Sequence, residues 1–182
     1  AVLGGSLVIQ EDAYFYNRFI MVTPTEELMY YDKRHTFTLA GEHKAYRAGE
    51  NEGIFDYEGW KICLRICYDL RFPVWSRNTQ DYDLLLYVAN WPKPRINAWD
   101  TLLKARAIEN LSYVVGVNRI GKDEKDNEYT GHTAVYDPLG LCISGGPSAI
   151  ESLVTAELDY LELQAQRKRL RFLEDRDNFD LY

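Results

Sequence analysis

The chain has 182 residues, of which 46% are hydrophobic and 14% aromatic, and its formal net charge at pH 7 is -7. This apolar content predicts one sizeable core, and residues 1–182 are expected to form a single domain because two ordinary domains need a longer chain. The acidic balance argues against nucleic acid or an anionic membrane as a partner, because both bind surfaces rich in lysine and arginine.

No apolar run approaches the ~20 residues of a membrane-spanning helix. The three cysteines, Cys63, Cys67 and Cys142, cannot all pair with one another, so the sequence predicts a reducing, cytoplasmic setting. Residues 1–6 lead directly into strand-like sequence without an initiator Met, so the chain is expected to begin within a fold.

The first half of the chain is rich in short β-type runs. Residues 1–9 and 18–23 are predicted to be neighbouring strands joined by a polar turn. A third run, Leu28–Tyr31, ends in the polar cluster Asp32–His35. Four further elements are expected before residue 80: a loop over 41–51, strands over 54–57 and 60–67, and a short helix over 73–78.

The second half mixes buried strands with one strong helix. Residues 84–89 are apolar throughout, which is typical of a strand covered on both faces, and residues 97–110 carry apolar side chains at helical spacing. The remaining expected elements are strands over 112–118, 134–136, 141–143 and 153–158, a charged turn over 122–127, and a helix over 161–172. Mixed strands and helices of this kind predict a layered α/β fold.

Cys67 stands where an apolar strand is expected to end, which would present its thiol beside free backbone N–H groups. A thiolate at such a place can attack a carbonyl carbon, whereas the alternative is a buried structural cysteine. Cys63 lies four residues earlier, but no further Cys or His pair follows at zinc-like spacing. No metal is therefore predicted, and Cys63 and Cys142 are expected to be core residues.

Lys33 could serve this nucleophile, because a lysine close to a thiol lowers its pKa and stabilises a developing oxyanion. Glu42, in the predicted loop, could handle protons. A papain-like pairing of cysteine with His35, His43 or His132 is the alternative, but no local signature supports it.

Four segments, in this order, resemble the signature blocks of the nitrilase superfamily of carbon–nitrogen hydrolases. The similarity covers essentially the whole chain and is greatest to the omega-amidase branch, which hydrolyses the distal amide of 2-oxo dicarboxylic acid monoamides such as 2-oxoglutaramate. The four segments are Tyr31–Phe37, Cys67–Pro73, Tyr87–Pro92 and Ala105–Asn110.

The resemblance implies a four-layer α-β-β-α sandwich that usually associates through its helical layer, so a homodimer or higher homo-oligomer is expected. It also implies a Glu-Lys-Cys triad without metal or cofactor. By matching blocks, Cys67 is the nucleophile, Lys33 the oxyanion-binding cation and Glu42 a glutamate that positions substrate and lysine. The backbone N–H of Tyr68 would be a second oxyanion donor, and Asn90 and Trp91 would line the pocket.

One part of the family pattern has no match in this sequence. The general-base glutamate of the family lies upstream of the strand pair with which the chain opens, so the sandwich is expected to be incomplete at its N-terminus and the base is not assigned. Arg71 is the candidate for a substrate carboxylate, with pairing to Asp69 or a buried glutamate as the alternative. Another amidase, a nitrile hydrolase or a non-catalytic associating subunit remain the alternative functions.

Overall fold

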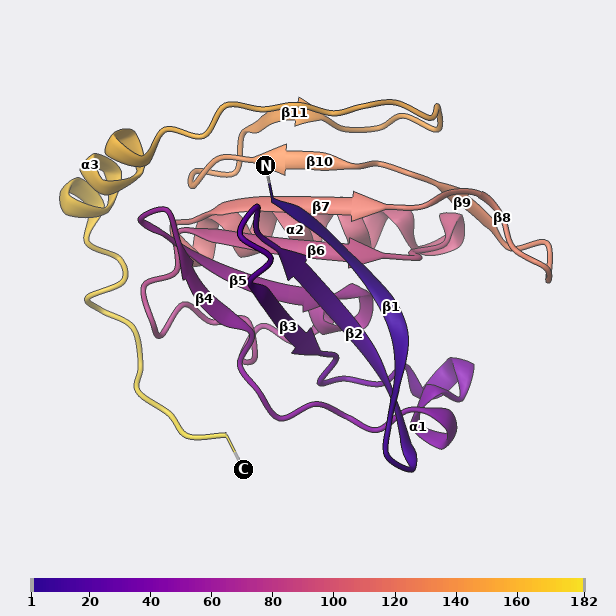
Figure 1. The fold of residues 1–182 in the computed structure, drawn as a ribbon. Helices are drawn as coiled ribbons and strands as arrows, with labels where there is room; N and C mark the ends of the chain where they lie inside the picture. The colour runs from indigo at the N-terminus through magenta and orange to yellow at the C-terminus, as the bar shows by residue number, and fades with distance from the viewer. Residues whose placement is uncertain (1, 182) are drawn as a thin grey trace.

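The computed structural model describes residues 2–181 and contains two β-sheets that pack face to face (Figure 1). The smaller sheet is antiparallel and has the order β1-β2-β3. Its strands are β1 (Leu3–Glu11), β2 (Tyr14–Val22) and β3 (Leu28–Asp32). The turn between β1 and β2 is only Asp12–Ala13, so both strands extend well into the predicted polar turn.

The larger sheet has six strands in the order β11-β10-β7-β6-β5-β4. Its central strands β5, β6 and β7 are parallel, whereas the strands at both sides are antiparallel. Its strands are β4 (Ile54–Tyr57), β5 (Trp60–Ile66), β6 (Leu84–Ala89), β7 (Tyr113–Asn118), β10 (Ala134–Tyr136) and β11 (Cys142–Gly145). A separate hairpin is formed by β8 (Ile120–Lys122) and β9 (Glu128–Thr130).

Helix α2 (Ile96–Asn110) connects β6 to β7 and lies against the larger sheet, as the apolar spacing of residues 97–110 predicted (Figure 1). Its close approach requires Gly116 on β7, since a Cβ there would lie 2.4 Å from Leu103 Cδ1 and 2.7 Å from Trp99 Cζ2. The other helices are short: α1 (Glu42–Ala45), α3 (Tyr160–Leu170) and the 3-10 helices η1 (Thr38–Ala40), η2 (Cys67–Arg71) and η3 (Lys93–Arg95).

Two apolar cores hold these layers together. Phe19, Met21 and Leu64 belong to the core between the two sheets. Leu85, Trp99, Leu103 and Val114 belong to the core between the larger sheet and α2. The order of layers is therefore sheet, sheet, helix, which is the arrangement expected of an incomplete α-β-β-α sandwich.

Helix α3 is fixed at the far end of the central strands, away from their carboxyl ends. Leu163 is completely buried, and Arg167 forms a 2.7 Å ion pair with the buried Asp83 just before β6. Within residues 2–181, none of the helices has the length and apolar character of a membrane span.

Two predicted elements are wrong. Residues 73–78 form turns and not a helix, and the true helical turn there is η2, which starts at Cys67. Residues 153–158 form no strand: Leu153 is exposed, and a bond from the Ser144 hydroxyl to the Thr155 carbonyl connects this segment to β11. The predicted loop over 41–51 is also not wholly irregular, because α1 lies within it.

Candidate active site

The carboxyl ends of the parallel strands β5, β6 and β7 meet at one edge of the larger sheet, the edge where α/β folds usually place their sites. Cys67 follows β5, Asn90 follows β6, and Asn118 ends β7. A cleft of about 980 Å³ opens at this edge. Its lining includes all seven residues that the sequence predicted for the site, which are Lys33, Glu42, Cys67, Tyr68, Arg71, Asn90 and Trp91.

Cys67 occupies a sharp turn between strand β5 and helix η2. Its φ is 46°, in the left-handed region, although it is not a glycine. Such a conformation costs about 1–3 kcal/mol in a residue other than glycine, so the surrounding structure must hold it in place. Tyr68 is the second residue of η2, so its N–H belongs to the first turn, where the helix itself offers no acceptor. The turn therefore places a thiol next to a backbone donor in the cleft.

The protonation of Cys67 differs from the prediction. Burial is the largest influence and raises the pKa of the Cys67 thiol, while the Lys33 ammonium opposes this rise and the Glu42 carboxylate adds to it. The expected lowering of the Cys67 pKa is therefore wrong in its net direction: Lys33 does lower the pKa, but burial outweighs it. The Cys67 sulfur lies 4.0 Å from the carbonyl oxygen of Asn90.

Lys33 is brought to the cleft by the end of β3 and is only 2% exposed. Its backbone N–H donates to the carbonyl of Asn17 on β2 at 2.9 Å, and its Nζ donates to Glu42 Oε2 at 2.6 Å. The same carboxylate oxygen accepts the N–H of Phe37 at 2.8 Å. A buried ammonium is costly without a paired anion, so the ion pair with Glu42 stabilises the burial of Lys33 and fixes its direction.

Part of the cleft lining is aromatic and cationic. The guanidinium of Arg71 lies over the ring of Trp91, 5.0 Å from its centroid. Trp91 is nearly buried, and its Nε1 donates to the carbonyl of Arg95 at 2.7 Å, so it offers the cleft an apolar face. Arg71 is exposed and forms no ion pair within residues 2–181. Within these residues, Arg71 therefore pairs neither with Asp69 nor with a glutamate.

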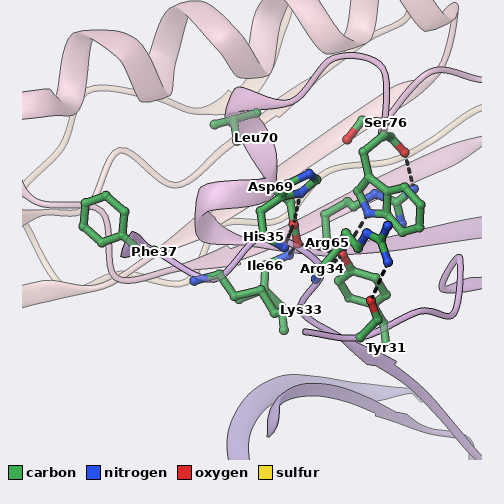
Figure 2. Close-up of polar contacts among 12 residues, drawn as sticks. Tyr31, Lys33, Arg34, His35, Phe37, Arg65, Ile66, Asp69, Leu70 and Ser76 are labelled. Carbon is green, nitrogen blue, oxygen red and sulfur yellow. Dashed lines mark hydrogen bonds and ion pairs between the residues drawn. The ribbon is translucent and has the colours of Figure 1, made fainter. Parts of the chain in front are cut away.

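Asp69 and Asn118 were not predicted as site residues, yet they hold its loops. The Asn118 amide accepts the N–H of Trp91 at 2.7 Å and donates to the carbonyls of Trp91 and Gly131 at 3.0 and 2.7 Å. Asp69 is completely buried and binds groups from β3 and β5 (Figure 2). The signal for Asp69 was a carboxylate placed inside a segment of mostly apolar residues.

The histidines do not form the papain-like pair considered above. His35 Nδ1 lies 2.8 Å from Asp69 Oδ1, and His132 Nδ1 lies 2.9 Å from Asp100 Oδ2. His43 lies on α1 and is exposed. In the described part of the chain, none of the three lines the cleft, and no group of three or more His, Cys, Asp or Glu is arranged to hold a metal ion.

Known proteins with similar sequences agree on one family. The model of the carbon–nitrogen hydrolase family matches residues 1–168. Omega-amidase YafV of Yersinia enterocolitica is 46% identical over 179 residues, which are 98% of this chain and 70% of that protein. The 2-oxoglutaramate amidase of Bacillus subtilis is 35% identical over 177 residues, or 96% of this chain and 68% of that protein.

The fold has a close match among solved structures. The crystal structure of XC1258 from Xanthomonas campestris, a CN-hydrolase superfamily protein with an arsenic adduct in its active site, matches with a TM-score of 0.95 at 40% identity. The match covers 100% of this chain and 71% of that one, and it confirms the predicted sandwich. The chain therefore belongs to the carbon–nitrogen hydrolase family of the nitrilase superfamily, in its omega-amidase branch, and is a hydrolase of non-peptide carbon–nitrogen bonds.

Proposed function

We propose that this protein hydrolyses the side-chain amide of a small dicarboxylic acid monoamide, such as 2-oxoglutaramate, through a thioester on Cys67 and releases ammonia. The observation that carries the proposal is that the Cys67 thiol and the Lys33 ammonium line one cleft, close enough for Lys33 to act on the thiol pKa. Relatives named omega-amidase and 2-oxoglutaramate amidase, at 46% and 35% identity, support the substrate class.

In the first half of the reaction, Cys67 gives its proton to a carboxylate base and its sulfur adds to the amide carbon. The family resemblance places that base in a glutamate upstream of β1. The carbonyl oxygen becomes an oxyanion, which the Lys33 ammonium and the Tyr68 N–H stabilise by about 3 kcal/mol each. The tetrahedral intermediate then collapses, the carbon–nitrogen bond breaks, and the nitrogen leaves as ammonia with the proton returned by the base.

In the second half, water attacks the thioester carbon while the base removes one of its protons. The same two donors hold the second oxyanion. The carbon–sulfur bond then breaks, the acid product leaves, and the Cys67 sulfur recovers its proton. Glu42 does not react in either half: it orients Lys33 and keeps its charge in place, as the 2.6 Å ion pair supports.

The substrate carboxylate is assigned to Arg71. A guanidinium binds a carboxylate through two parallel hydrogen bonds, and Arg71 presents an exposed guanidinium to the cleft without an ion-pair partner among residues 2–181. Trp91 supplies the apolar wall beneath Arg71, and Asn90 borders the cleft beside the sulfur. An amide substrate with an anionic far end therefore suits this site.

The quaternary and cellular setting is part of the same proposal. We propose that residues 1–182 act as one domain in a homodimer or higher homo-oligomer in the cytoplasm. The family association through the helical layer supports the assembly, and Ile108 on α2 is an exposed apolar residue on that layer. The three free cysteines suit a reducing compartment. Light scattering after size-exclusion chromatography and cell fractionation test the two points separately.

The test of the function is ammonia release from 2-oxoglutaramate, compared with glutamine, nitriles and carbamoyl compounds. Turnover of 2-oxoglutaramate that Cys67→Ala abolishes is the expected result. Cys142→Ala is the matched control, because Cys142, contrary to its expected place in the core, is exposed outside the cleft, and its loss should leave turnover unchanged. Preferential turnover of nitriles would replace the substrate assignment, and wild-type turnover in Cys67→Ala would refute the nucleophile.

A further inference from the structure

Asp69 lies behind the cleft with no exposed surface, and its two oxygens each accept two hydrogen bonds. Oδ2 accepts the Tyr31 hydroxyl at 2.8 Å and the Ile66 N–H at 3.0 Å. Oδ1 accepts the His35 N–H at 3.0 Å and lies 2.8 Å from His35 Nδ1. Figure 2 shows Tyr31, His35 and Ile66 gathered around this one side chain.

The partners of Asp69 flank the two proposed reacting residues in the sequence. Tyr31 lies two positions before Lys33 and His35 two positions after it, while Ile66 directly precedes Cys67. One carboxylate therefore connects the end of β3 with the turn after β5. We infer that Asp69 is a positioning residue that fixes the Lys33 ammonium relative to the Cys67 sulfur, a role that rests on the proposed function.

The bonds to Asp69 are themselves held in place. The Tyr31 oxygen donates to Asp69 and accepts the Arg34 N–H at 3.1 Å and the Trp75 Nε1–H at 2.9 Å, so its hydrogen-bonding capacity is filled. Burial raises the pKa of Tyr31 well above its usual value, which keeps the hydroxyl protonated as a donor. A tether of this kind transmits any change at Asp69 to both strand ends.

The ring of His35 is held just as firmly. It stacks on Phe72 with centroids 3.6 Å apart and planes 3° from parallel. Phe72 follows η2, so His35 connects the segment after Lys33 with the end of the helix that begins at Cys67. The contact between the two segments therefore has an aromatic part as well as the four bonds to Asp69.

A positioning role and a purely electrostatic role predict opposite effects on Cys67. The charged groups that act on the Cys67 thiol are Lys33, which lowers its pKa, and Glu42 and Asp69, which raise it. If Asp69 acted only as a charge, its neutralisation would make thiolate formation easier. If Asp69 holds Lys33 in place, its loss lets the ammonium move away, and thiolate formation becomes harder.

The experiment is the pH dependence of Cys67 alkylation by iodoacetamide in Asp69→Asn, followed by peptide mass spectrometry. Asn cannot accept all four bonds, because its NH₂ group faces N–H and O–H donors. Compared with the natural protein, the inflection of the alkylation profile should lie at higher pH. If the pKa of Cys67 rises by about one unit, the alkylation rate at pH 8 should fall about tenfold. In turnover, kcat should be about 10²-fold lower and KM nearly unchanged, because small displacements of the reacting groups slow the chemical step.

Asp83→Asn is the matched control, because Asp83 is also buried, accepts the Lys61 N–H at 2.9 Å and pairs with Arg167, but lies outside the cleft. It should lower stability without changing the alkylation profile of Cys67. An unchanged or lower inflection in Asp69→Asn overturns the inference. An equal shift in Asp83→Asn would do the same, since it would show a general effect of lost stability.

Should Asp69→Asn fail to fold, as judged by circular dichroism, Tyr31→Phe decides. This substitution removes one hydrogen-bond donor to Asp69 and keeps the Asp69 charge. A smaller rise in the pH of the alkylation inflection supports the tether, and an unchanged alkylation profile overturns it. Alkylation needs no substrate. Suppose that the alkylation inflection moves to higher pH in Asp69→Asn as expected, but the natural protein turns over no amide. That result would refute the proposed function and leave the tether between Lys33 and Cys67 intact.

Discussion

Replacement of Lys33 by methionine removes the ammonium that lowers the pKa of Cys67 and retains most of the side-chain volume. If Lys33 is an oxyanion donor, its loss costs about 3 kcal/mol in the transition state. At about 1.36 kcal/mol per factor of ten, this is a decrease in kcat of about 160-fold. After the replacement, Glu42 still accepts the Phe37 N–H and is partly exposed to solvent, so its unpaired charge is partly compensated. The free energy of unfolding should therefore fall by about 3 kcal/mol, the lower limit for breaking a buried ion pair.

The assays are ammonia release from 2-oxoglutaramate, urea unfolding, and the pH profile of Cys67 alkylation. The alkylation inflection should move to higher pH, because Lys33 lowers the pKa of Cys67. The control is the double variant Lys33→Met with Glu42→Gln, which removes the unpaired charge and should recover stability without recovering turnover. A kcat within tenfold of the natural protein in stable Lys33→Met would refute the reasoning.

Three further outcomes are expected. Arg71→Met should raise KM for 2-oxoglutaramate about 10- to 100-fold, because a charge-assisted hydrogen bond is lost, and should leave KM for neutral amides unchanged. An equal rise in KM for both kinds of substrate would contradict the assignment. Burial raises the pKa of Cys63 from 9.0 to about 11, so the free energy of unfolding should fall as pH rises through this window, and Cys63→Ala should weaken that dependence in urea titrations. Asp123 accepts bonds from Lys125, Asn127 and Tyr129, so Asp123→Ala should speed amide exchange in the β8–β9 hairpin and not in β5.

Elements with strong local patterns could be predicted from the sequence. The strand over 84–89 and the helix over 97–110 were confirmed: the first is apolar throughout, and the second buries Trp99, Leu103 and Ala107 at helical spacing. The helix expected over 73–78 rested on Pro73, but distant partners decide this segment: the Arg65 guanidinium binds the carbonyl of Trp75, and Asn110 accepts the N–H of Asn78. The expected strand over 153–158 failed because a β-rich composition forms no ladder without a paired neighbour.

The sequence named residues that line one cleft in the structure, but it did not predict the interactions among them. Cys67, Lys33 and Glu42 came from the order of the motifs, since nothing in their spacing indicates that β3 packs beside the turn after β5. The 2.6 Å pair of Lys33 with Glu42 depends on α1, a helix too short to leave a periodic signal. The pKa of Cys67 was predicted in the wrong direction because the sequence could not reveal how far burial would outweigh Lys33.

The most direct test of the account looks for the covalent intermediate itself. Protein turning over 2-oxoglutaramate is quenched in acid, digested, and analysed by peptide mass spectrometry. The expected result is an acyl group on the peptide that contains Cys67, which is absent before substrate is added and forms more slowly when Lys33 is replaced by methionine. Continued ammonia release with an unmodified Cys67, or an acyl group on Cys63 or Cys142, would contradict it.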